Sequence, residues 1–513
     1  MKQYKDSISE VEGENFRGGK IRPLKEDHRK KQVEVSFQFE FDVASLQARV
    51  DNGEIFTLQQ IKREFGPNET DVLKLTSWLR QNGWKDIERS NDGFGVFAKN
   101  TTDNISKSLN CEFSSVECDG LCENVVAVSA PNLPLELKGI SSIDGLQPFG
   151  KREKKSKRSD VLRKTGFYRS ANTHGLPYKI KSVLKAYGGD TVTFTGLNQT
   201  IGILIDSFPY DSDLVKFWNL CGVNTSLSRI KKINVRGVRI PAPSGEESLD
   251  TQWTSGIAPQ AIVSIYAIAD LYFTSLNKGL DRMISDCSKD PTFRQISISL
   301  GIGEKMVSTG EMNTENSKYL VLRSLGVNIF VSSGDGGSNP YSRLQVEFPA
   351  CNPNVVAVGG TTLNLNSSTG SLISETAWSG SGGGISGYYT KPSYQSLVAG
   401  SFRLVPDVSA LADPNTGAMV ILSNITYQIG GTSLSAPIWA GICALINDAR
   451  VRAKKSRIPF ISPRVYSSIG SSRFRDITTG SNGQYSASTG YDRVTGVGVP
   501  NISNLISYFL SLP

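Results

Sequence analysis

The chain has 513 residues, 38% hydrophobic and 20% charged, a balance that suits a soluble globular protein and excludes a mostly disordered one. Its net charge is +8, but residues 151–169 alone hold nine basic and two acidic side chains, so this segment supplies +7. Charge gathered in one linker-like segment, rather than spread over a folded face, argues against nucleic-acid binding.

The first third of the chain predicts a tail, a mixed domain and a linker. Residues 1–32 are polar with little periodicity, so we expect a flexible tail. Strands and helices alternate over residues 33–150, which predicts a compact α+β domain. The basic segment 151–175 follows as a linker. The expected elements are strands at Val33–Asp42, Phe94–Ala98 and Val125–Ser129, and helices at Thr57–Phe65, Glu69–Asn82 and Asp103–Leu109.

Residues 176–513 show a different rhythm, in which short runs of β-branched residues alternate with helical stretches. This alternation predicts an α/β domain with a mostly parallel sheet flanked by helices. Active sites in such sheets gather at the carboxyl ends of the strands. The expected strands are Ile201–Ile205, Ile262–Ala267, Ile296–Leu300, Val327–Ser332 and Val355–Val358, and the expected helices are Asp211–Leu220, Glu246–Gly256, Leu271–Cys287 and Thr314–Leu325.

Histidine is scarce: the chain has only His28, in the expected tail, and His174, beside the linker. A Ser-His-Asp triad needs an imidazole base, and zinc hydrolases usually need two or more histidines. The seven cysteines include no CxxC pair, so thiolate metal binding has no support either. A hydrolase with this sequence needs another base.

A candidate nucleophile is Ser433, which follows Gly430 and Gly431 and precedes the apolar helix expected at Ile438–Ile446. A helix N-terminus offers free N–H groups and a positive dipole end, which can stabilise an oxyanion. The alternative is an ordinary Ser/Thr-rich helix cap.

A candidate base is the pair Glu246 and Asp250, which lie on one helix face at positions i and i+4. Two buried carboxylates so close share a proton, and such a pair acts as a base at acid pH. The alternative is an acidic helix start that complements the helix dipole.

A third acid, Asp335, stands between glycines just beyond an expected strand. A protonated carboxyl there can donate a hydrogen bond to an oxyanion, although a turn aspartate is the plain alternative. Near the C-terminus, Asp476 and Asp492 lie in two loops whose carboxylates and carbonyls can form an oxygen cage for calcium, without the spacing of an EF-hand.

Together these segments resemble the sedolisin family of serine-carboxyl peptidases, which includes tripeptidyl peptidase I. The resemblance covers nearly the whole chain, and residues 33–150 look like the family's propeptide. Its most specific marks are Gly431-Thr432-Ser433-Leu434-Ser435-Ala436-Pro437 and Ser333-Gly334-Asp335-Gly336; Phe348-Pro349-Ala350, Val358-Gly359-Gly360-Thr361, Trp378-Ser379, Pro406-Asp407-Val408-Ser409 and Tyr491-Asp492 support it.

The resemblance implies a subtilisin-like catalytic domain in which a carboxylate replaces histidine. Ser433 would be the nucleophile, Glu246 the general base, Asp250 its orienting partner and Asp335 the oxyanion-hole acid. One structural Ca²⁺ is implied, held by the side chains of Asp476 and Asp492 and the carbonyls of Ile477, Ser488 and Gly490. Ser488 stands where the family often has glycine, which a carbonyl ligand tolerates at negative φ. Residues 205–210 also depart from the family, with no consequence evident from the sequence.

The implied enzyme is made as a zymogen, acts on peptides or proteins at about pH 3–5, and is inhibited by its own propeptide until the linker is cut within about residues 151–180. Endopeptidase and tripeptidyl exopeptidase activity both remain open. A pseudoenzyme that kept the fold, and a histidine-dependent subtilisin, are the rival interpretations.

The expected compartment is extracellular or lysosome-like. Eight Asn-x-Ser/Thr sequons suit a secretory path, whereas the first residues show no signal peptide. The sequence predicts a monomer without a membrane span, because the apolar run near residues 261–273 is broken by Asp270 and falls short of the about 20 residues a span needs.

Overall fold

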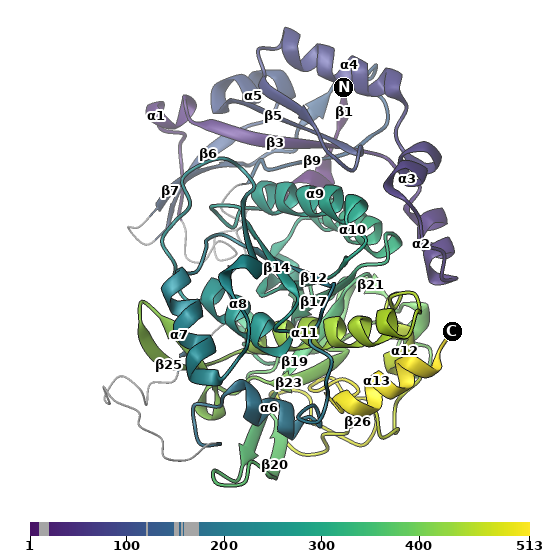
Figure 1. Cartoon of the computed structure of the whole chain (residues 1–513). Helices are drawn as coiled ribbons and strands as arrows, with labels where there is room; N and C mark the ends of the chain where they lie inside the picture. Colours follow the sequence, from purple (N-terminus) through teal and green to yellow (C-terminus); the bar gives the residue numbers. More distant parts are fainter. Residues whose placement is uncertain (10–19, 119–121, 148–152, 155–156, 159–173) are drawn as a thin grey trace. The chain divides into compact units, whose positions relative to one another are not determined.

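The computed structural model describes the chain except residues 10–19, 119–121, 148–152, 155–156 and 159–173 (Figure 1). The described residues group into two compact units. The first unit comprises Met1–Arg152, Asp270–Lys289 and Lys305–Leu325, and the second comprises Glu153–Ala269, Asp290–Glu304 and Gly326–Pro513.

The first unit is built around a four-stranded antiparallel sheet in the order β4-β5-β3-β9. Strands β2, β6 and β7 form a second sheet. The elements are β1 (Lys2–Gln3), β2 (Lys20–Arg22), α1 (Glu26–Arg29), β3 (Gln32–Phe39), α2 (Val43–Asp51), α3 (Leu58–Phe65), α4 (Glu69–Gln81), β4 (Lys85–Arg89), β5 (Gly95–Thr101), α5 (Thr102–Leu109), β6 (Phe113–Cys118), β7 (Cys122–Ala127), β8 (Asn132–Leu133) and β9 (Ile140–Asp144).

Local chemistry explains why α3 and α4 begin where the sequence predicts. Thr57 and Gln60 form a reciprocal capping box at the start of α3, and Asn68 caps α4. Helix α4 then buries one apolar stripe, with Leu75 and Leu79 fully covered. Mixed strands and helices are thus present within residues 33–150, and the bounds of this domain stay a prediction.

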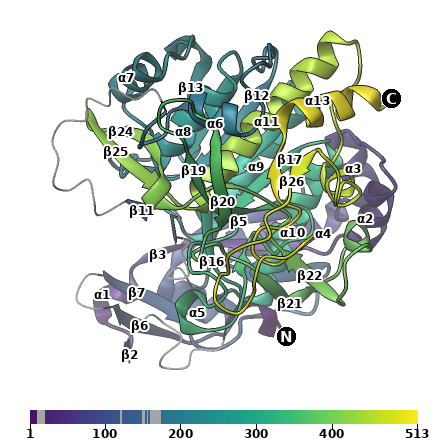
Figure 2. The ribbon, with the colours of Figure 1, turned by 90° about the horizontal axis from the view of Figure 1, so that it is seen from below.

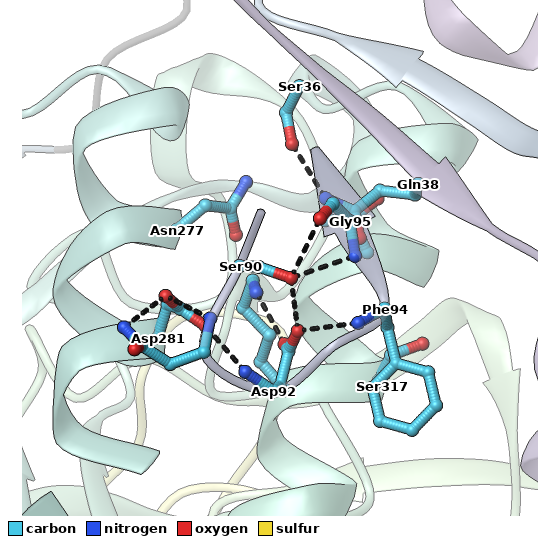
Figure 3. Close-up of polar contacts among 12 residues, drawn as sticks. Ser36, Gln38, Ser90, Asp92, Phe94, Gly95, Asn277, Asp281 and Ser317 are labelled. Carbon is cyan, nitrogen blue, oxygen red and sulfur yellow. Dashed lines mark hydrogen bonds and ion pairs between the residues drawn. The ribbon is translucent and has the colours of Figure 1, made fainter. Parts of the chain in front are cut away.

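Two later helices, α9 (Phe273–Lys289) and α10 (Thr309–Ser324), also belong to the first unit. Figure 3 shows Asp281 of α9 bonded to Asp92 in the loop before β5. The Asp281 carboxylate accepts hydrogen bonds from the backbone N–H groups of Asn91 and Asp92 at 2.8 and 2.9 Å. Lys318 of α10 donates to Asp92 at 2.7 Å. The compact units thus do not follow chain order, because these helices pack with the N-terminal sheets.

The structure differs from the expectation of a flexible tail over residues 1–32. Strand β1 pairs with β8, and β2 pairs with β6. Tyr4 is buried, and so is His28, whose Nδ1 lies 2.8 Å from the Ser115 hydroxyl. Hydrogen bonding to distant strands gives order that local periodicity does not reveal.

The second unit contains the predicted parallel sheet, in the order β13-β14-β12-β15-β17-β19-β20, with β23 also paired to β19. All pairs are parallel except β19 with β20. The sheet strands are β12 (Thr200–Ile205), β13 (Ile230–Asn234), β14 (Ile262–Ala267), β15 (Phe293–Ile298), β17 (Asn328–Ser332), β19 (Val356–Leu365), β20 (Leu372–Ala377) and β23 (Val408–Leu411).

Helices α8 (Glu246–Ile257) and α11 (Thr432–Arg452) pack against each other, and α11 lies over β15, β17 and β23. Close approach requires a glycine here, since a Cβ at Gly441 would come within 2.7 Å of the Ile257 side chain. The other helices are α6 (Ile180–Ala186), α7 (Asp211–Cys221), α12 (Ser462–Tyr466) and α13 (Ile502–Ser511). The α/β fold with a mostly parallel sheet is confirmed.

Two small antiparallel sheets include pieces of the basic segment. Strand β10 (Glu153–Lys154) pairs with β16 (Leu300–Gly303), and β11 (Lys157–Arg158) pairs with β25 (Ile425–Gly430). Figure 2 shows β11, β25 and β24 (Ala418–Leu422) side by side. The remaining strands are β18 (Glu347–Phe348), β21 (Gly384–Thr390), β22 (Phe402–Val405), β26 (Phe474–Arg475) and β27 (Val499–Pro500).

Within the ranges that the structure describes, no helix combines the length and apolar character needed to cross a membrane.

Candidate active site

Ser433 lies where the sequence places it, at the second residue of α11. Gly431, just before the helix, has φ +111°, a conformation that L side chains rarely adopt. Ser433 is fully buried, and its hydroxyl has no hydrogen-bond partner among the described residues. A buried hydroxyl at a helix N-terminus without a structural bond suits a nucleophile better than a helix cap.

Glu246 and Asp250 share the first turns of α8, and both are almost fully buried. Burial raises the pKa of Asp250 well above its usual range, and the nearby charge of Glu246 raises it further. An acidic helix start that merely complements the dipole would be solvated, so burial favours the proton-sharing interpretation.

Ser299 connects the acid pair with the start of α11, and sequence reasoning missed it. Its hydroxyl donates to Asp250 Oδ1 at 2.7 Å and lies 3.3 Å from the backbone oxygen of Ser433. The available signal was position: Ser299 follows β15, at the carboxyl edge of a parallel sheet, where active-site residues gather.

Asp335 is hydrogen-bonded to the same helix start. It follows β17 and accepts hydrogen bonds from the backbone N–H of Thr432 at 2.8 Å and from the Thr432 hydroxyl at 2.9 Å. The Thr432 hydroxyl in turn accepts from the Gly334 N–H at 3.1 Å. These bonds hold Asp335 against the residue next to Ser433, rather than in an isolated turn.

His174 has a structural setting in the second unit. Its Nδ1 lies 3.1 Å from the Ser182 hydroxyl, and the ring is buried. Burial lowers the pKa of His174, and nearby Lys185 and Lys181 add to this. The hydrogen bond of this imidazole goes to a helix hydroxyl, and it involves none of Ser433, Glu246 and Asp250.

The two C-terminal carboxylates meet the backbone of one loop. Asp476 Oδ2 accepts the Gly490 N–H at 2.7 Å, and Asp492 Oδ2 accepts the Ser488 N–H at 3.2 Å. The second oxygen of Asp476 is buried without a hydrogen-bond partner in the described parts of the chain. Burial raises the pKa of Asp492, although the hydrogen bonds that its carboxylate accepts from backbone N–H groups lower it.

The described residues contain no group of three or more His, Cys, Asp or Glu side chains placed to hold a metal. The candidate calcium ligands are of another kind: two carboxylates and the backbone of the loop between them. An uncompensated oxygen on Asp476 is what a hard cation would satisfy, so this donor set fits calcium.

Two family models match separate parts of the chain: the subtilase family over residues 244–460, and the pro-kumamolisin activation domain over residues 43–149. Among curated relatives, sedolisin from Pseudomonas sp. (strain 101) is 29% identical over 90% of this chain and 82% of its own length. Kumamolisin from Bacillus sp. (strain MN-32) is 31% identical over 60% of this chain and 59% of its own length. Human tripeptidyl-peptidase 1 is 26% identical over 61% of this chain and 60% of its own length.

Among solved structures, Pseudomonas sedolisin, a serine-carboxyl proteinase complexed with two molecules of pseudo-iodotyrostatin, aligns with a TM-score of 0.57. It is 30% identical and covers 67% of this chain and 99% of its own. The epidermin leader peptide processing protease of Staphylococcus aureus, at 13% identity and a TM-score of 0.53, shows the fold alone.

Proposed function

The chain belongs to the sedolisin family of serine-carboxyl peptidases and carries the activation domain of a zymogen, and from this premise we propose that Ser433, Glu246, Asp250 and Asp335 carry its chemistry. The observation behind the proposal is the chain of contacts from Asp250 through Ser299 to Ser433, with Asp335 bonded to Thr432. It links the buried Asp250 to the backbone of the residue that carries the unbonded, buried hydroxyl, without a histidine.

In the proposed mechanism, Glu246 takes the proton of Ser433 as the hydroxyl attacks the peptide carbonyl. Asp335 and N–H groups at the start of α11 stabilise the oxyanion. Glu246 then passes the proton to the leaving amine, and water hydrolyses the acyl-enzyme. Asp250 positions Glu246 and shares its proton, while the Ser299 hydroxyl orients Asp250.

The mechanism requires acid conditions. Asp335 must hold a proton to donate to the oxyanion, and the Glu246–Asp250 pair must share one. The raised pKa of Asp250 keeps that proton bound above the usual carboxyl range. We infer an optimum at roughly pH 3–5, with activity lost as rising pH removes these protons.

Activation follows from the order of the segments. We infer that residues 33–150 are the inhibitory propeptide, that 151–175 is the cleavable linker, and that 176–513 is the catalytic domain. Most of the linker lies outside the described residues. Its nine basic residues in 151–169 make it polar, which favours cleavage, here placed within about residues 151–180.

For calcium, Asp476 and Asp492 would supply carboxylate oxygens, and Ile477, Ser488 and Gly490 would supply carbonyl oxygens. One bound ion would fasten the two loops together. Chelation is therefore expected to lower the melting temperature of wild type, and Asp476→Asn is expected to remove most of that shift. An equal shift in both proteins would count against this site.

The expected substrates are peptides or proteins, cleaved internally or as tripeptides from an N-terminus. We infer a monomer that works in an acidic extracellular or lysosome-like compartment.

The assignment is tested with a serine-directed fluorophosphonate and a peptide substrate at about pH 4. Wild type is expected to be labelled at Ser433 and to hydrolyse the peptide, and Ser433→Ala is expected to do neither. Ser435→Ala is a matched control, because its hydroxyl already donates to backbone oxygens of Ala410 and Leu411. It should keep both activities, and His174→Gln should too. Wild type that is neither labelled nor active at any pH would favour a pseudoenzyme.

A further inference from the structure

Two short pieces of the basic segment lie as added strands in the second unit. Glu153 and Lys154 pair antiparallel with Gly301 and Leu300 of β16. Lys157 and Arg158 pair antiparallel with Gly430 and Ile429 of β25. Strand addition of this kind is a common way for a protein to bind an extended peptide.

Both partner strands are connected directly to the proposed catalytic residues. Strand β16 begins one residue after Ser299, which bonds to Asp250. Strand β25 runs through Gly430 into Ser433, three residues later. The paired pieces are therefore held by strands that adjoin the proposed active site in sequence.

The ammonium of Lys154 is bound by two acids and a hydroxyl. Its Nζ lies 2.7 Å from Asp206 Oδ1, 2.6 Å from Ser244 Oγ and 3.8 Å from Glu247 Oε2. The Lys154 and Asp206 side chains are 20% and 15% exposed, whereas Glu247 is fully buried. A charge pair with this little water contact is stronger than a surface ion pair.

The acids are fixed by their own elements, independently of Lys154. Asp206 directly follows β12, at the carboxyl end of a central strand. Glu247 accepts hydrogen bonds from the Gly245 N–H at 2.8 Å and the Ser207 hydroxyl at 3.1 Å. Glu247 is thus anchored by bonds that do not involve Lys154, and Asp206 stands at the end of a sheet strand, which lowers the ordering cost of binding a cation.

We propose that Asp206, Glu247 and Ser244 form a substrate subsite for a primary ammonium, above all a lysine side chain, and that the chain's own Lys154 fills it before activation. The proposal rests on the proposed function, because it assumes a peptide bound beside Ser433. It gives a role to Asp206 and Ser207, which lie within residues 205–210, where the chain departs from the family. The charge of Lys154 also reaches the acid pair, where it lowers the pKa of Asp250 against the effect of burial.

The test measures kcat/KM of the acid-activated protein on internally quenched peptides. In each peptide one residue position carries either lysine or its uncharged analogue norleucine, and every peptide is made with a free and with an acetylated N-terminus. At one of these positions, the kcat/KM of wild type is expected to be about tenfold higher for lysine than for norleucine, which corresponds to about 1.4 kcal/mol. Acetylation should leave this preference unchanged.

The Asp206→Asn and Ser244→Ala variants are expected to lower the lysine-to-norleucine ratio to about threefold or less. A purely structural role would lower both rates together and leave the ratio unchanged. Asp211→Asn is the matched control, because this nearby exposed acid pairs with Lys232 instead, and it should retain the full ratio. Labelling of Ser433 confirms that each variant is folded.

Four outcomes would overturn the subsite. Wild type that hydrolyses the peptides without a lysine preference contradicts it and leaves the proposed function intact. A loss of hydrolysis on acetylation that is equal for the lysine and the norleucine peptides, with no lysine preference in either series, assigns the acids to a peptide N-terminus instead of a side chain. A preference that survives in Asp206→Asn and Ser244→Ala places lysine recognition elsewhere. Absence of both hydrolysis and labelling at Ser433 would overturn the proposed function as well.

Discussion

The two units each bury a cluster of carboxylates, and the clusters differ in what balances their charge. In the first unit, Asp92 pairs at 2.7 Å with Lys318, and both side chains are almost fully buried. In the second unit, the charge with the largest effect on the pKa of Asp250 is that of another acid, Glu246. Burial raises the pKa of both aspartates, but the Lys318 charge lowers the pKa of Asp92 overall, while Asp250 stays well above its usual range.

This contrast shows how buried acids of one residue type acquire different tasks. A carboxylate with a buried cation stays ionised and fastens structure together. A carboxylate beside another carboxylate must hold or share a proton, which makes it an acid–base group. The neighbours, and not burial alone, set the role.

The largest expected effect comes from removing the base. Glu246→Gln keeps the shape of the side chain but cannot accept the Ser433 proton, so kcat should fall by about 10³-fold or more. Steady-state hydrolysis at acid pH measures this. The control is Glu315→Gln, a buried acid of α10 that accepts the Tyr319 hydroxyl, which should keep kcat within about threefold. If kcat of Glu246→Gln fell by less than about tenfold, Glu246 would not be the general base.

The next effect comes from removing the cation of the first cluster. Lys318→Met leaves Asp92 buried without its partner and should lower the free energy of unfolding of the uncleaved protein by about 3–5 kcal/mol. Denaturant titration of Ser433→Ala protein, which cannot process itself on this account, measures the change. Adding Asp92→Asn should restore part of the loss. A loss below about 1 kcal/mol would mean that the pair is solvated.

A smaller effect concerns the pH dependence of stability in the first unit. Burial raises the pKa of Asp144 to about 6, although the Thr314 hydroxyl donates to it at 2.6 Å. Because the folded pKa lies above the unfolded value, the folded unit binds more protons between about pH 4 and 6. Asp144 therefore makes stability fall as pH rises through this window, by on the order of 3 kcal/mol or less.

Asp144→Asn should flatten that slope in denaturant titrations of the same Ser433→Ala background. Asp42→Asn, at the exposed N-cap of α2, serves as the control and should leave the slope between pH 4 and 6 nearly unchanged. An unchanged slope in Asp144→Asn would show that this carboxyl is already ionised near pH 4.

Much of the fold followed from local pattern, because apolar runs and caps are written in neighbouring residues. The helix of Glu246 and Asp250 and the start of α11 at Ser433 lie close to where the sequence predicted them. Contacts between distant segments were not predictable in this way. The Ser299 hydroxyl links Asp250 to Ser433 across gaps of 49 and 134 residues, and no periodicity encodes it.

The same limit explains the other differences. Residues 2–3 lack periodicity, yet they gain order by pairing with residues 132–133. The basic segment looked like solvated charge, but Lys154 meets Asp206 and Glu247, which are far from it in sequence. From the sequence, charged side chains are expected to be exposed to solvent. Only the fold shows which of them form ion pairs with distant residues.

The most direct test of the account is intact mass over time after uncleaved protein is shifted to about pH 4 with calcium present. Wild type is predicted to lose about 16–19 kDa from its N-terminus, the mass of about 150–175 residues, while Ser433→Ala and Glu246→Gln stay intact. That result would support the nucleophile, its base and the propeptide boundary together. Equal cleavage of all three proteins, or of none, would contradict self-processing by Ser433 and Glu246.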